Sequence, residues 1–176
     1  MTEQWYHMVT EIHQKDTLIE YLQNHPEEFD GTVKLSYDTK DPKAWRACWI
    51  TFHCMRKNDD RVKPHLSGMI EALGQLKDGH QRELMKVLNK MTLDDDLEGR
   101  LFDVAMNMWE SVKKQPSIRH TALKIILRVI KKYPELWTDL KYVLGDEYLE
   151  SLSPGIRHIL EREIKELESK LSPDSY

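Results

Sequence analysis

The sequence contains little of what secreted, membrane-spanning or sheet-rich proteins require. Its 176 residues include two cysteines, Cys48 and Cys54, whose spacing fits neither a zinc half-site nor a disulfide scaffold. No eighteen apolar residues run uninterrupted, and the N-terminal residues lack the basic and apolar regions of a secretory signal. Seven glycines and seven prolines are few for a many-stranded sandwich or a βαβ enzyme. We therefore expect a helical, cytoplasmic protein without contact to a membrane.

The motifs of common enzyme classes are also absent from the sequence. It contains no GxxxxGK[ST], GxGxxG or GxSxG, and none of its eight histidines lies in an HExxH motif. Asp94, Asp96 and Glu98 before Gly99 imitate the start of a calcium loop, but the twelfth position, which needs a bidentate glutamate, is Ala105. Acidic capping of the following helix explains these residues better. We expect a protein that is not an enzyme, with no cofactor and no metal.

What the sequence does contain is an internal repeat. Seven apolar positions between Cys48 and Ile70 are apolar again 74 residues later, between Ala122 and Leu144. An intermediate copy lies 35 to 36 residues after the first, and a last half-copy begins at Ile156. The second helix of each pair has apolar residues at i, i+4, i+7 and i+8, which is the spacing of a helix that buries one stripe. The repeat predicts stacked pairs of antiparallel helices.

Prolines and turn residues place the helix boundaries. We expect helices near residues 16–24, 26–37, 42–57, 61–76, 80–91, 97–114, 117–132, 134–148 and 154–171, and a further turn or two near the N-terminus. The fold class is thus all-α, an α-solenoid of HEAT or armadillo-like helix pairs with about 8–9 helices. We expect a single domain over residues 1–176, with repeats near 14–40, 41–78, 79–115 and 116–153 and a capping helix at 154–171.

Four short segments are similar to a known family. The segments 46–50 and 57–66 resemble one segment of small HEAT-like proteins common in Bacteroidetes, and the segments 119–123 and 132–136 resemble that family's second matching segment. The likeness covers residues 14–170 and implies a HEAT-like fold, but it brings no catalytic residues. Some members are labelled adenylosuccinate lyase. Because this chain has no Ser-Ser pair, it lacks the Ser-Ser-x-Met-Pro loop of a lyase, and we expect no such activity.

Positive charge is concentrated in one part of the chain. The segment 113–142 has a net charge of +6, whereas the rest sums to -10. Lys124, Arg128 and Lys131 lie at i, i+4 and i+7 and share one helix face, which an anionic partner could use. The alternative is that this apolar helix has one narrow solvent strip and places its charges there.

The five tryptophans have different expected positions. Trp45 and Trp49 are predicted to pack in the core. Trp109 and Trp137 lie at the edges of apolar stripes, where they either seal neighbouring repeats or flank a groove.

Two functional hypotheses follow from these patterns. The leading one is a non-catalytic module that binds a protein or peptide. The alternative is a HEAT solenoid that binds nucleic acid through the basic segment 113–142, although the net charge of -4 disfavours it. The candidate binding residues are Lys124, Arg128, Lys131, Trp109, Trp137 and Lys141.

Overall fold

The structure, a computed structural model, describes residues 1–171 except for the side chains of Asp139 and Leu171. Within this range the regular secondary structure is entirely helical, so the predicted all-α class is confirmed. The α-helices are α1 (Glu3–Glu11), α2 (Lys15–Asn24), α3 (Glu28–Leu35), α4 (Ala44–Cys54), α5 (Leu66–Leu73), α6 (Asp78–Asn89), α7 (Asp95–Glu110), α8 (Pro116–Lys132), α9 (Trp137–Leu140), α10 (Asp146–Leu149) and α11 (Pro154–Leu171). Three short 3-10 helices are η1 (Lys63–His65), η2 (Pro134–Leu136) and η3 (Lys141–Leu144).

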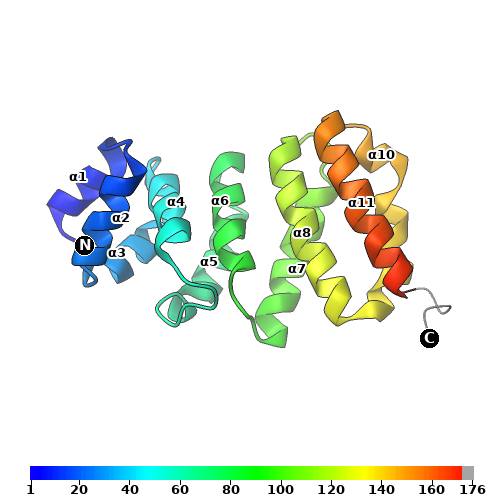
Figure 1. Cartoon of the computed structure of the whole chain (residues 1–176), viewed down its shortest axis with the longest axis horizontal. Coiled ribbons are helices and arrows are strands. Elements are labelled where there is room, and N and C mark those ends of the chain that lie inside the picture. Colours follow the sequence, from blue (N-terminus) through cyan, green and yellow to red (C-terminus); the bar gives the residue numbers. More distant parts are fainter. Residues whose placement is uncertain (172–176) are drawn as a thin grey trace. The chain divides into compact units, whose positions relative to one another are not determined.

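The chain divides into two compact units, Met1–Leu97 and Glu98–Tyr176. In the first unit, α4 packs against α1, α2, α3 and α6, and α5 packs against α6 (Figure 1). In the second unit, α8 packs against α11. None of the helices in the described part of the chain combines the length and apolarity needed to cross a bilayer.

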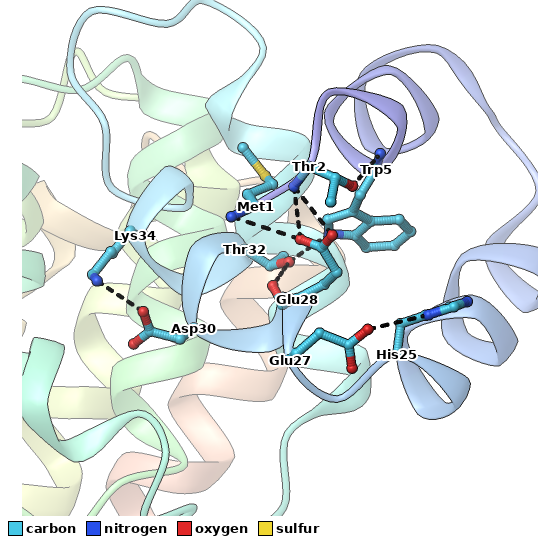
Figure 2. A network of polar contacts seen from close by, with 9 residues as sticks. All are labelled: Met1, Thr2, Trp5, His25, Glu27, Glu28, Asp30, Thr32 and Lys34. Carbon is cyan, nitrogen blue, oxygen red and sulfur yellow. Dashed lines mark hydrogen bonds and ion pairs between the residues drawn. The ribbon is translucent and has the colours of Figure 1, made fainter.

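Helix α1 is longer than the turn or two predicted at the N-terminus, and polar contacts with α3 hold it (Figure 2). The backbone N–H of Thr2 donates to both carboxylate oxygens of Glu28, at 3.1 and 3.0 Å, and the Met1 ammonium lies 3.7 Å from the same group. The fully buried Trp5 donates from its indole N–H to the Thr32 hydroxyl at 2.6 Å. Burial raises the pKa of Glu28, but these contacts outweigh burial and lower it. The network keeps a buried carboxylate ionised.

Helix α4 has two apolar stripes that differ in side-chain size. Its fully or nearly fully buried side includes the small residues Ala44, Ala47, Cys48 and Thr51. Small side chains let neighbouring helices approach closely, which leaves no space for an indole on that side. Trp45 is accordingly 42% exposed and Trp49 is half-buried. The prediction that both tryptophans pack in the core is wrong for Trp45 and only partly right for Trp49.

The loop between α4 and η1 is built around Asp59. The buried carboxylate accepts hydrogen bonds from the backbone N–H groups of Arg56 and Arg61, both at 3.1 Å, and from the Arg61 guanidinium at 3.0 and 2.7 Å. Asn58 has a φ of 54°, in the left-handed region that asparagine tolerates. These contacts end α4 at Cys54, and the next α-helix begins at Leu66 after a 3-10 turn. Both helices are therefore shorter than predicted.

The largest difference from the sequence prediction lies at residues 134–148, which do not form one helix. The segment is divided into η2, α9, η3 and α10, and Gly145 is extended, with a ψ of 170°. Short helices leave several carbonyl groups without intrahelical partners. Arg119, which is fully buried, satisfies one of them: its guanidinium donates to the carbonyl of Tyr148 at 2.8 Å and to the hydroxyl of Ser151.

Arg46 and Arg119 perform the same structural task in the two units. Arg46 donates to the carbonyl oxygens of Val9, at 2.7 Å, and Ile12 at the end of α1. Arg119 donates to the Trp109 carbonyl at 2.8 Å, near the end of α7. A cation beside helix C-terminal carbonyls is favoured by the helix dipole. The segments 46–50 and 119–123 both begin with an arginine, and in each unit this arginine binds carbonyl groups at the end of a preceding helix.

Candidate functional site

The predicted basic stripe on α8 is partly neutralised within its own unit. Lys124 and Lys131 are exposed as expected. Arg128 is 28% exposed and lies 3.9 Å from the Glu98 carboxylate, and Lys132 donates to the same carboxylate at 2.7 Å. Since Glu98 is buried between these two cations, only part of the charge on α8 remains for an external anion. A binding role of the three stripe residues stays a prediction.

The other three candidate residues differ in their accessibility. Trp109 is fully buried and donates from its indole N–H to the Val143 carbonyl at 2.7 Å, so it packs in the core. Trp137 is half-buried in α9. Lys141 is exposed, and its ammonium lies 5.3 Å from the ring of Tyr142. For Trp137 and Lys141 a binding role stays a prediction, whereas Trp109 is inaccessible.

The acidic run before α7 and the two cysteines have structural roles. Asp94 accepts a hydrogen bond from the Leu97 N–H at 2.9 Å, which confirms the capping interpretation of the acidic run. The structure brings no three His, Cys, Asp or Glu side chains together in metal-binding geometry among the residues it describes. Burial raises the pKa of Cys54 to about 11 and that of Cys48 well above its ordinary value. Both thiols are therefore protonated at neutral pH and are poor nucleophiles.

An aromatic surface that the sequence analysis did not assign to binding lies on α4. Trp45, Trp49 and Phe52 follow one another at i, i+4 and i+7, and His53 lies beside the last two. The His53 ring is 5.0 Å from the Trp49 ring and 5.4 Å from the Phe52 ring, both in edge-to-face geometry. We refer to these four residues as the aromatic row. It leaves apolar ring surface exposed beside polar atoms.

Helix α6 packs next to α4 (Figure 1), and a row of cations runs along α6 and the residue that follows it. Arg82, Lys86 and Lys90, spaced by four residues, form this cationic row. Arg82 and Lys86 donate to the buried Glu83 carboxylate at 2.9 and 3.0 Å. Lys90 donates to the Phe52 carbonyl at 2.7 Å, and its ammonium lies 4.1 Å from the centroid of the Phe52 ring. The contact of Lys90 with Phe52 joins the two rows.

A pocket lies at the Trp45 end of the two rows. Its volume is about 640 Å³, and its lining includes Trp45, Arg82, His80 and two lysines from the preceding loops, Lys40 and Lys77. This volume is within the range of ligand pockets. In the described part of the chain neither lysine ammonium has a hydrogen bond or an ion pair, and both side chains are exposed. We call this hollow the Trp45 pocket.

Two histidines near the two rows have pKa values below the ordinary value for histidine. Burial, followed by the nearby charges of Lys15, Lys90 and Lys86, lowers the pKa of His53, and Glu83 does not offset them. Burial also lowers the pKa of His80, whose Nε2–H donates to the Ser36 carbonyl at 2.7 Å. Both imidazoles are therefore neutral at pH 7, and around His53 the charges of the three lysines outweigh that of Glu83.

The sequence carried a signal for this surface that the repeat analysis did not use. Residues 44, 47, 48 and 51 form a stripe of small side chains, and residues 45, 49 and 52 form a parallel aromatic stripe. A helix with apolar side chains on both sides is ambiguous, but the small stripe is the one that fits a close helix contact. Comparing side-chain sizes would have placed the tryptophans outside.

The helices and their packing define a helical-repeat protein of the α-solenoid class. A family model described as HEAT repeat domain matches residues 6–167, which is most of the chain. The protein therefore belongs to the HEAT repeat family, as the resemblance of its four segments predicted. Comparison with curated proteins and with solved structures gives no match.

Proposed function

We propose that this protein is a non-catalytic HEAT repeat module whose first unit binds another protein through the aromatic row and the Trp45 pocket. The observation that carries the proposal is the position of Trp45 and Trp49. The unit buries Trp5 completely, yet it leaves Trp45 42% exposed and Trp49 only half-buried. Exposed tryptophans are rare on monomeric surfaces but frequent among the residues that dominate the energy of protein interfaces.

The first unit is a better supported site than the basic segment 113–142. That segment owes part of its positive charge to Arg119, which is fully buried. Arg128 and Lys132 share the Glu98 carboxylate. The nucleic-acid alternative therefore rests on fewer available cations than the sequence suggested, because backbone recognition needs cations that can replace counterions.

Affinity capture from an extract of the native cells tests the proposal. Three baits are compared: the wild type, the double variant Trp45→Ala/Trp49→Ala, and the control Lys124→Ala/Lys131→Ala, which truncates exposed side chains in the second unit. Circular dichroism and urea unfolding establish that each bait is folded. We expect at least one protein to be enriched on the wild type and on the control and to be lost from the tryptophan variant. Equal recovery on all three baits, or no recovery on any, would contradict the proposal.

A further inference from the structure

We infer that the partner segment is an acidic peptide that lies along the aromatic and cationic rows and inserts an apolar side chain into the Trp45 pocket. The inference rests on the proposed function and adds the chemistry of the partner. Two observations support it: the exposed Trp45 indole lines a pocket, and several cations surround the aromatic and cationic rows.

The cations come from four parts of the first unit. They are Lys15 in α2, Lys40 and Lys77 in loops, Arg82 and Lys86 in α6, and Lys90 directly after α6. The chain as a whole has a net charge of -4, so this concentration is not a property of the entire surface. A local excess of one charge favours a partner of the opposite charge and accelerates its association.

The carboxylates in the same region already have partners in this chain. Asp38 accepts a hydrogen bond from the Lys40 N–H at 2.8 Å. Asp41 accepts from the Lys43 N–H at 2.7 Å and from the Tyr6 hydroxyl at 2.8 Å. Asp38 and Asp41 line the Trp45 pocket itself, and Glu83 binds Arg82 and Lys86 on α6. The ammonium groups of Lys40 and Lys77 are therefore the best placed to pair with carboxylates of a partner.

The arrangement of the rings favours a peptide over single-stranded nucleic acid. Bases stack on successive aromatic faces, but the Lys90 ammonium already lies 4.1 Å from the centroid of the Phe52 ring. His53 meets both Trp49 and Phe52 edge to face. Within the aromatic row, Trp45 is the ring that is 42% exposed and lines the pocket described above. A single pocket that receives one apolar side chain, with charged residues around it, is typical of peptide recognition.

Fluorescence anisotropy with defined probes tests this chemistry. The probes are a labelled peptide with glutamates on both sides of one phenylalanine, the same peptide with every glutamate replaced by lysine, and an oligothymidylate of similar length. We expect the acidic peptide to bind about tenfold or more tightly than the lysine peptide and to weaken with added salt. Equal affinity for the two peptides, or tighter binding of the oligonucleotide, would overturn the inference.

Charge reversal locates the binding site. Lys40→Glu/Lys77→Glu should weaken the acidic peptide about tenfold, since two screened attractions become repulsions. Lys124→Glu/Lys131→Glu changes the net charge of the chain equally and should leave the affinity within about twofold. The same loss in both variants would mean that only the net charge matters, and no loss in the first would exclude the Trp45 pocket.

An NMR titration of the histidines gives an independent readout. Lysines around His53 contribute to its lowered pKa, so bound carboxylates should raise this pKa toward its ordinary value. An unchanged pKa of His53 in the saturated complex would contradict the proposed position of the peptide. If affinity capture still depends on Trp45 and Trp49 while the acidic probe shows no preference, the partner chemistry is wrong and the protein-binding function stands.

Discussion

The Asp59 carboxylate fastens the loop between α4 and η1, and Asp59→Asn removes its charge with little change in shape. The guanidinium that pairs with Asp59 belongs to Arg61, which also lies 3.7 Å from the centroid of the Phe29 ring of α3. Loss of the charge should therefore loosen the contact of this loop with α3.

The expected magnitude follows from the pKa of Asp59. Hydrogen bonds from the Arg61 side chain, reinforced by the Arg56 and Arg61 backbone N–H groups, outweigh burial and lower this pKa from 3.8 to about 2. A difference of this size between the folded and unfolded states corresponds to about 2 kcal/mol of stability at neutral pH. Because the folded pKa is the lower one, this contribution is present above about pH 4 and is lost as the pH falls toward 2.

Urea unfolding of the wild type and Asp59→Asn across this pH range measures the effect. We expect the variant to be about 2 kcal/mol less stable at pH 7 and the difference to shrink below about pH 4. Arg61→Ala and the double variant complete a cycle that isolates the pair. A difference below about half a kcal/mol at pH 7, or one independent of pH, would refute the reasoning.

Three further expectations concern stability. Arg119→Ala should cost about 3 kcal/mol or more in urea unfolding, and Arg119→Lys should recover less than half, because a point charge cannot reach carbonyls of both Trp109 and Tyr148; a loss below 1 kcal/mol contradicts this. Leu123→Ala, at a fully buried position, should cost about 2 to 5 kcal/mol, and a neutral effect would disprove the predicted helix register. Since burial lowers the pKa of His80, stability should fall as the pH drops below about 6.5. His80→Gln should flatten that profile, and an unchanged profile would exclude His80 as its source.

Apolar periodicity predicted the bounds of a long, largely buried helix well. Helix α8 was placed within a residue of its observed bounds, because apolar residues around most of its circumference require burial on several sides. Periodicity failed at residues 134–148, where an apolar stripe ending at Leu144 predicted one helix that continued through Gly145, although the backbone there is extended. A stripe records which side chains are buried, and several short turns can bury them as well as one helix.

The candidate site was less predictable for a related reason. Charge counting along the chain identified the segment 113–142, but it could not see that Glu98, from another helix, would lie between Arg128 and Lys132. Nor could it bring loop residues Lys40 and Lys77 to one pocket with Trp45, because they are separated by more than thirty residues of sequence. Such contacts depend on tertiary packing, which a single sequence shows only indirectly.

The most direct test of a binding surface on the first unit is the ¹⁹F NMR spectrum of the chain labelled with 5-fluorotryptophan. The five tryptophans sample the core of each unit, the proposed surface and the alternative near the basic segment. On addition of the captured partner, or of the acidic peptide, the resonances of Trp45 and Trp49 should shift or broaden, while those of the buried Trp5 and Trp109 stay unchanged. A change confined to Trp137, or no change in Trp45 and Trp49 at saturation, would contradict the account.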